Sequence, residues 1–127
     1  MSANLSDSFS VLLVDDDPDT QALFEDALGH YGITLHTAYN TASALALLEN
    51  GIPDVIVLDI FLPDTDGYRL MQTIRDLPQH PACPIVAITG YYASDTMNDL
   101  KKRGFDGYML KPLDPEEIVR YLQNLAA

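Results

Sequence analysis

The chain has 127 residues, of which 47% are hydrophobic and 20% charged, which suits one domain around one core. It carries 19 Asp and Glu against 7 Lys and Arg, and this acidic balance argues against direct binding to nucleic acid or to an anionic membrane. No apolar stretch reaches the roughly 18 residues of a membrane span, and residues 1–8 lack the pattern of a signal peptide. The single Cys83 cannot form an internal disulfide. We therefore expect a cytoplasmic protein, with a flexible polar tail over residues 1–8 and a folded domain over residues 9–127.

Five short segments have the pattern of β-strands. Four of them are apolar runs bounded by Asp, Gly or Pro, which is typical of strands buried on both faces: residues 9–14, 55–58, 85–88 and 108–110. The fifth, residues 34–38, alternates polar and apolar side chains and therefore suits the edge of a sheet.

Helical patterns fill the intervals between these strands. The first and last helices open with an aspartate cap followed by proline at the first helical position, at residues 17–18 and 114–115. Thr41 is the predicted cap of the second helix. Apolar residues three or four apart mark the third over residues 70–77, and the fourth, residues 94–103, has the weakest apolar seam.

A strand followed by a helix, five times over, predicts an α/β protein with a parallel sheet and helices on both faces. The most suitable arrangement is the flavodoxin-like (βα)5 three-layer sandwich with strand order 2-1-3-4-5. Functional sites in such sheets form beyond the carboxyl ends of the strands.

Polar side chains that suit phosphoryl chemistry follow four of the strands. Asp15 and Asp16 end the first strand, Asp59 the third, Thr89 the fourth and Lys111 the fifth. The topology brings these residues to one edge, where a divalent cation would make three carboxylates tolerable, and hard carboxylate oxygens suit Mg²⁺. A cation, a lysine and a carboxylate nucleophile together form a site for transfer of a phosphoryl group to an aspartate.

The segments "VDDDP", "LDIFLPDTDG", "ITG" and "LKP" stand in this order over nearly the whole chain. In that combination the sequence resembles the receiver domain of two-component response regulators, the CheY-like family, with residues 9–127 as the receiver domain. The resemblance implies that Asp59 is the phosphoacceptor, and that Asp15, Asp16, Asp59 and the backbone carbonyl of Phe61 hold Mg²⁺. The sequence departs from the family pattern conservatively at Leu62, where methionine is common.

The same resemblance assigns roles to three residues near the other strand ends. Lys111 pairs with Asp59 and then with a phosphate oxygen, Thr89 donates its hydroxyl to the phosphate, and Tyr108 takes the position of an aromatic switch. The peptide bond between Lys111 and Pro112 is expected to be cis. The implied phosphodonor is a histidine kinase or a histidine phosphotransfer protein. The implied readout face consists of the fourth helix, the fifth strand and the fifth helix, and a homodimer through this face is one option.

Some acidic residues have plainer explanations. Asp17 is better read as a helix cap than as a ligand. Asp64 and Asp66 lie in a stretch that superficially resembles a calcium loop, but its other ligands are missing, so we predict a turn closed by Gly67.

Three other functions fit the sequence less well. A haloacid-dehalogenase type of enzyme would need a second aspartate two residues after the nucleophile, where this chain has Phe61, so we expect a signalling phosphoacceptor that promotes its own phosphorylation rather than an enzyme. A degenerate receiver that only binds a protein is disfavoured by the complete set of acidic residues, Thr89 and Lys111. A dinucleotide-binding domain is excluded because no glycine-rich turn follows the first strand.

Overall fold

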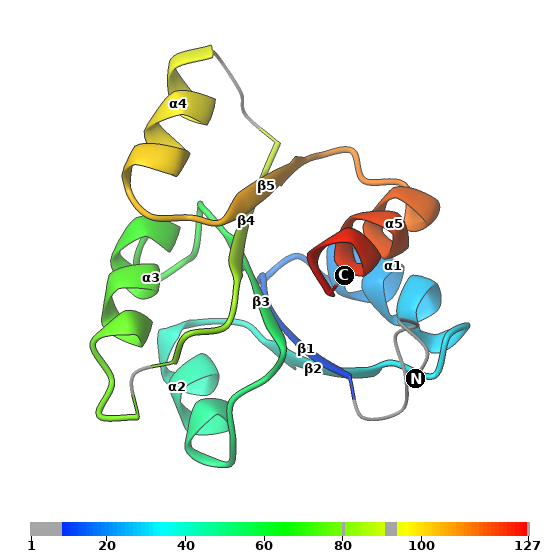
Figure 1. Ribbon diagram of the computed structural model, residues 1–127, viewed down its shortest axis with the longest axis horizontal. Helices are drawn as coiled ribbons and strands as arrows, with labels where there is room; N and C mark the ends of the chain where they lie inside the picture. The colour runs from blue at the N-terminus through cyan, green and yellow to red at the C-terminus, as the bar shows by residue number, and fades with distance from the viewer. Residues whose placement is uncertain (1–8, 80, 91–93, 127) are drawn as a thin grey trace.

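Five parallel strands form the centre of the computed structural model, which describes residues 9–79, 81–90 and 94–126. Their order is β2-β1-β3-β4-β5, with α1 and α5 on one face and α2, α3 and α4 on the other (Figure 1). The strands are β1 (Ser10–Val14), β2 (Thr34–Ala38), β3 (Val55–Asp59), β4 (Ile85–Thr89) and β5 (Gly107–Leu110). The helices are α1 (Pro18–Gly29), α2 (Thr41–Glu49), α3 (Gly67–Arg75), α4 (Ser94–Lys102) and α5 (Pro115–Ala126). The predicted flavodoxin-like fold is confirmed, whereas the predicted tail over residues 1–8 lies outside the described part of the chain.

Two hydrophobic cores lie on the two faces of the sheet. Successive side chains of a strand point to opposite faces, so Leu13 and Val57 pack toward α1 and α5 while Leu12 and Leu58 pack toward α2, α3 and α4. Both β3 and β4 are buried at all positions, as their continuous apolar runs predict. Burial of each such side chain stabilises the fold by about 1.5–3 kcal/mol, so the strand ends at the functional edge are firmly placed.

Helix α1 begins as predicted, with Asp17 as its cap and Pro18 as its first residue. The predicted cap of α2 is wrong by one residue. Asn40 caps α2, because its side chain accepts the Ser43 amide at 2.9 Å and the Ser43 hydroxyl accepts the Asn40 amide in return. Thr41 is instead the first helical residue.

Helix α3 begins at Gly67, where the Asp66 side chain accepts the Arg69 amide at 2.8 Å and caps the helix. The Gly67 amide donates to the Ile60 carbonyl at 2.8 Å and closes the loop after β3, as predicted. The helix ends at Arg75, short of the predicted 70–77 range. No helix within the described residues is long and apolar enough to cross a membrane.

Candidate functional site

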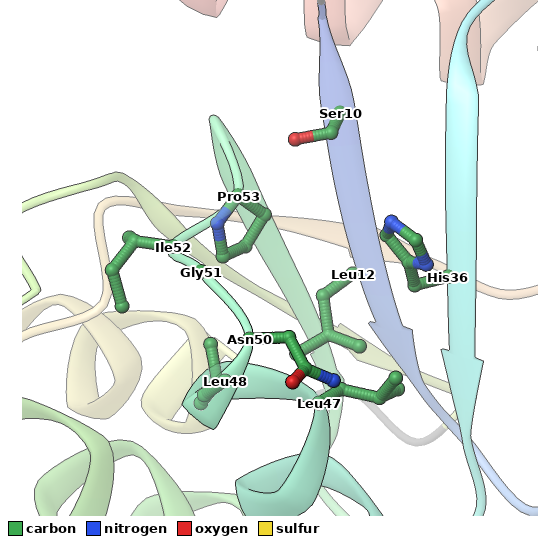
Figure 2. Close-up of a pocket in the computed structure, with 9 residues that line it drawn as sticks. All are labelled: Ser10, Leu12, His36, Leu47, Leu48, Asn50, Gly51, Ile52 and Pro53. Carbon is green, nitrogen blue, oxygen red and sulfur yellow. The ribbon is translucent and has the colours of Figure 1, made fainter.

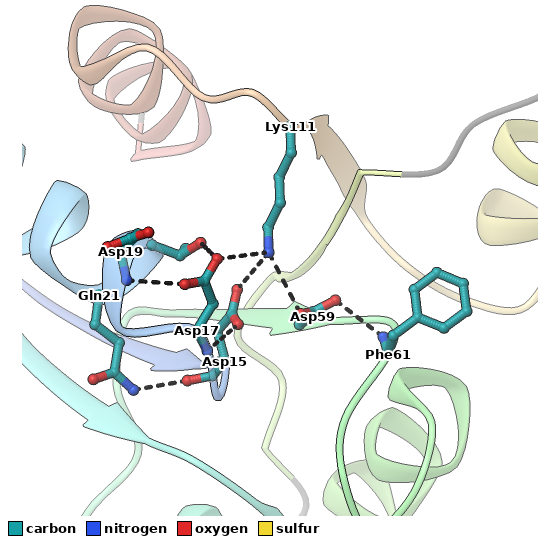
Figure 3. Close-up of polar contacts among 8 residues, drawn as sticks. Asp15, Asp17, Asp19, Gln21, Asp59, Phe61 and Lys111 are labelled. Carbon is teal, nitrogen blue, oxygen red and sulfur yellow. Dashed lines mark hydrogen bonds and ion pairs between the residues drawn. The ribbon is translucent and has the colours of Figure 1, made fainter.

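Three of the predicted site residues meet at the carboxyl edge of the sheet. The ammonium nitrogen of Lys111 lies 3.1 Å from Asp15 Oδ2 and 3.6 Å from Asp59 Oδ2 (Figure 3). A third carboxylate oxygen, Asp17 Oδ2, lies 4.0 Å from the same nitrogen. Asp15 and Asp59, which are 44 positions apart in the sequence, therefore share one cation, because β1, β3 and β5 all end at this edge.

Asp15 is held in place by the turn between β1 and α1. Its amide donates to the Ala38 carbonyl at 3.0 Å, which continues the pairing of β1 with β2. Its Oδ1 accepts the Asp17 amide at 2.9 Å, and its backbone carbonyl accepts the side-chain amide of Gln21 at 2.7 Å. The side chain is fully buried, and its Oδ2 accepts no hydrogen bond within the described residues, with Lys111 as its ion-pair partner. This oxygen is therefore left with capacity for a further cationic partner.

Asp59 is the last residue of β3 and is only 6% exposed. Its Oδ1 accepts the Phe61 amide at 3.0 Å, while the Phe61 ring points away from the carboxylates and is 62% exposed (Figure 3). Burial raises the pKa of Asp59 to about 6, and the negative charge of Asp15 adds to this rise, whereas the Phe61 amide and Lys111 oppose it.

Lys111 compensates part of the negative charge at this edge. Burial alone would lower the pKa of Lys111, but the carboxylates of Asp15 and Asp59 outweigh burial and raise it. The lysine therefore stays cationic at neutral pH, and it faces more carboxylates than it can neutralise.

The residues present fit a divalent cation. One carboxylate oxygen from each of Asp15, Asp16 and Asp59 can lie within 4.8 Å of the other two. Asp16 is exposed, whereas Asp15 and Asp59 are buried, so the cluster opens to solvent on one side. An all-oxygen donor set with an open side suits Mg²⁺, which binds through one or two carboxylates and keeps several waters.

Comparison with known proteins decides the family. Residues 11–123 match the response regulator receiver domain. The chain belongs to this family. It is 37% identical over 114 residues to an uncharacterized 14.6 kDa protein of Leptolyngbya boryana, which covers 90% of this chain and 87% of that protein. It is also 31% identical to the response regulator Rre1 of Synechocystis, over 97% of this chain and 54% of that protein. The receiver domain thus spans about half the length of that regulator.

Solved structures support the same family. A two-component response regulator from Clostridium difficile superposes with a TM-score of 0.84 at 29% identity, covering 92% of this chain and 94% of that one. The chemotaxis response regulator CheY4 of Vibrio cholerae also reaches 0.84, at 27% identity, with 92% of this chain and 98% of that one covered. The acidic cluster of this receiver domain therefore fits a phosphoacceptor site.

Thr89 and Tyr108 lie on neighbouring strands of the receiver domain, β4 and β5. Thr89 is the last residue of β4, is 1% exposed, and its carbonyl accepts the Lys111 amide at 2.9 Å. Tyr108 is half-buried on β5 opposite Ala87, and it packs against the core between the sheet and α2, α3 and α4. The bond between Lys111 and Pro112 is cis, as predicted.

Two residues between the end of β3 and the first turn of α3 were not predicted to support the site. Asp64 Oδ2 accepts the Thr41 amide at 3.1 Å and so connects this loop to the start of α2. A Cβ atom on Gly67 would lie 2.8 Å from the backbone oxygen of Asp59, so only glycine lets α3 approach the end of β3 this closely. The role of Gly67 could have been predicted from its position after a capping aspartate. The contact between Asp64 and Thr41 could not, because it joins residues 23 positions apart and has no local sequence pattern.

A pocket of about 260 Å³ lies away from the predicted site residues. Figure 2 shows it between the first half of β1 and the loop that follows α2, with Leu12, Leu48 and Pro53 among its walls. Its lining contains no carboxylate and none of the predicted residues. The acidic cluster thus lies at an edge of the sheet, apart from this pocket.

Proposed function

We propose that Asp59 accepts a phosphoryl group from the phosphohistidine of a histidine kinase or a histidine phosphotransfer protein. The observation that carries this proposal is the placement of one ammonium, Lys111 Nζ, between the buried carboxylates of Asp15 and Asp59. A carboxylate oxygen of Asp59 attacks phosphorus as the phosphorus–nitrogen bond of the donor breaks, and the histidine nitrogen leaves with that electron pair. The product is an acyl phosphate. At neutral pH most Asp59 is ionised, because its pKa is about 6, so it is competent as a nucleophile.

The metal proposed for this site is Mg²⁺. Asp15, Asp16 and Asp59 would hold it together with the backbone carbonyl of Phe61. When bound, Mg²⁺ neutralises negative charge on the transferring phosphoryl oxygens. The Phe61 amide donates to Asp59 Oδ1, which fixes the orientation of the carboxylate and leaves Oδ2 facing Lys111.

Lys111 and Thr89 would stabilise the phosphorylated state. Lys111 already lies 3.6 Å from Asp59 Oδ2, so a small side-chain movement brings its ammonium to a phosphate oxygen. Thr89 is at the end of the strand next to β3, within the same row of strand ends, and its hydroxyl would donate to another phosphate oxygen. Charge-assisted hydrogen bonds of this kind are about twice as strong as neutral ones.

The readout would use the face formed by α4, β5 and α5. Movement of Thr89 toward the phosphate would free space for the Tyr108 ring beside α4, and this change would alter affinity for a partner or for a second copy through that face. A cytoplasmic location stays a prediction. The chain would act as a signalling phosphoacceptor, since Phe61 provides no carboxylate at the position where a hydrolytic enzyme of similar chemistry needs its acid–base group.

The test is phosphorylation by a small phosphodonor such as phosphoramidate in the presence of Mg²⁺. Intact-protein mass spectrometry should show one added phosphoryl group, which Asp59→Asn and chelation of Mg²⁺ should each abolish. Asp64→Asn, in the same loop, is the matched control and should label normally, because the amide oxygen still accepts the Thr41 amide. Undiminished labelling of Asp59→Asn would reject the assignment, and sustained release of phosphate over many turnovers would indicate an enzyme instead.

A further inference from the structure

The positive charges of this chain are confined to its second half. Residues 1–68 contain 12 of the 19 Asp and Glu and no Lys or Arg, so the whole net charge of −12 resides there. The seven Lys and Arg all lie between Arg69 and Arg120, where seven acidic residues balance them. Lys111 lies among the carboxylates at the edge of the sheet, so the other six cations carry the positive charge elsewhere on the molecule.

Two of these cations, Arg69 and Arg103, line a groove between α3 and the end of α4. The groove has a volume of about 400 Å³ and is lined by Asp66, Tyr68, Arg69, Met71, Gln72 and Arg103. Lys101 and Lys102 precede Arg103 at the end of α4, and all four cationic side chains are exposed. We call Arg69, Lys101, Lys102 and Arg103 the basic cluster.

The Arg103 guanidinium is fixed over an aromatic wall. Its Cζ lies 4.4 Å from the centre of the Tyr68 ring, and Tyr68 in turn contacts Phe105 edge to face with ring centres 5.8 Å apart. Its ion pair with Asp99, at 3.4 Å, uses Nε and leaves the two terminal nitrogens for another carboxylate. Stacking and the ion pair restrict the side chain, so less entropy is lost when a ligand binds.

Arg69 lines the groove from α3. Its backbone amide binds Asp66, but its guanidinium forms no ion pair with any residue that the structure describes. Of the two carboxylates beside these arginines, Asp66 lines the groove and caps α3, and Asp99 pairs with Arg103. Two guanidiniums therefore flank a groove that has Tyr68 and the buried Met71 as apolar surface.

We propose that this groove binds an acidic segment of a partner protein, with a Glu or Asp carboxylate between Arg69 and Arg103 and an apolar side chain against Tyr68. The planar guanidinium presents paired donors that match a carboxylate, which an ammonium cannot do. The interaction uses no residue of the phosphoacceptor site.

The net charge of the chain favours an acidic peptide in the groove over a second copy of the chain or a nucleic-acid duplex. A short acidic segment lies within a Debye length, about 8 Å at physiological salt, of the basic cluster and interacts mainly with it. A second copy would bring its own net charge of −12 against this one, and a nucleic-acid duplex would extend past the basic cluster over acidic surface. An acidic peptide segment is therefore favoured over both.

The experiment is a fluorescence-anisotropy titration of the full chain with a fluorescein-labelled peptide of alternating Glu and Leu. Arg69→Gln should weaken binding about tenfold, which corresponds to about 1.4 kcal/mol. Arg120→Gln is the matched control, because it removes the same charge from an exposed position on α5 outside the groove, and it should change affinity less than about twofold. Arg103→Lys keeps the charge but loses the fork and the stacking, and should also weaken binding.

Three results would overturn the proposal. Equal weakening by Arg69→Gln and Arg120→Gln would mean that only overall charge matters. Binding of a duplex DNA probe at least as tight as that of the peptide would identify a nucleic-acid surface instead. Sedimentation that shows a dimer of the wild type, lost in Arg69→Gln, would assign the groove to a second copy of the chain.

Discussion

Asp59 is held in an environment that works against its charge. It is buried beside Asp15, and the single ammonium of Lys111 is divided between the two carboxylates. Such an arrangement costs folding free energy, because removing carboxylates from water is unfavourable unless each is fully compensated. The same arrangement prepares the site for a metal ion and a phosphoryl group, both of which bring new partners for these oxygens. The residues that the proposed chemistry needs thus lower the free energy of unfolding of the protein.

This conflict predicts a pH-dependent gain in stability for Asp59→Asn in the metal-free protein. The folded state raises the pKa of Asp59 from about 3.9 to about 6, so it binds the proton more tightly than the unfolded chain does. This contribution is fully present below about pH 4 and is lost as the pH rises through about 6. The asparagine side chain of the variant does not titrate, so the variant does not lose this stability as the pH rises. In chelator, the free energy of unfolding of the variant relative to the wild type should therefore rise by on the order of 1–3 kcal/mol between pH 4 and pH 7.5.

Urea denaturation at both pH values measures this difference. The matched control is Asp26→Asn, an exposed acidic position in the last turn of α1, far from the carboxylates, which should show no comparable rise. Mg²⁺ should reduce the advantage of Asp59→Asn, because it stabilises only the protein that binds it. A relative stability that stays flat across this pH range would mean that Asp59 is not strained in the folded protein.

At the scale of secondary structure, the strands were predictable and the helix starts were less so. Continuous apolar runs identify β3 and β4 because both faces of these strands are buried. The start of α2 was misplaced because Asn40 and Thr41 are both good caps, and the choice depends on which one can exchange bonds with Ser43. The start of α3 was missed because an aspartate before glycine is equally typical of a turn.

The residues of the site could be predicted from the sequence, whereas the contacts that support the site could not. Asp15, Asp59 and Lys111 follow three strands, and parallel topology alone brings strand ends to one edge. The contact between Asp64 and the Thr41 amide depends instead on the path of one loop in three dimensions. The groove beside the basic cluster likewise depends on how α3 packs near the end of α4, which no local pattern encodes.

The close approach of α3 to β3 predicts a strong effect of Gly67→Ala. The added Cβ would lie 2.8 Å from the Asp59 carbonyl oxygen and 2.9 Å from Ile60 Cα, both of them backbone atoms that cannot rotate away. We expect a loss of at least about 2 kcal/mol in the free energy of unfolding and slower phosphorylation of Asp59. The measurements are chemical denaturation and the rate of labelling by the small phosphodonor.

Gly29→Ala is the control for Gly67→Ala. Gly29 ends α1 and has nothing within 4 Å of an added Cβ, so alanine there should leave stability unchanged or raise it by up to about 1 kcal/mol. If both variants behave alike, the tight contact between α3 and the phosphoacceptor strand is not a constraint on the fold.

At the scale of the whole molecule, β5 connects the acidic edge to two helices. Lys111 follows β5 directly, and Tyr108 on this strand packs toward the face that α4 covers. On the opposite face, the Tyr121 hydroxyl of α5 occupies the space that a side chain at position 107 would need, and the Tyr108 backbone hydrogen-bonds to it. Among the strands that the structure describes, β5 is at the edge of the sheet and pairs with β4 alone. A displacement at Thr89 or Lys111 can therefore reach both α4 and α5 through one short strand.

This connection predicts that phosphorylation reaches the face formed by α4, β5 and α5. With Mg²⁺ and beryllofluoride as the phosphoryl mimic, amide chemical shifts should change near Asp59 and also at Tyr108, Tyr121 and residues 98–102. In Thr89→Ala the distant changes should shrink while those near Asp59 persist, because the hydroxyl that couples the two regions is missing. Thr89→Ser keeps this hydroxyl and should retain the distant changes. Shifts confined to the acidic edge in the wild type would refute the switch, and the phosphoacceptor assignment would stand, because the edge alone carries out the chemistry proposed for Asp59.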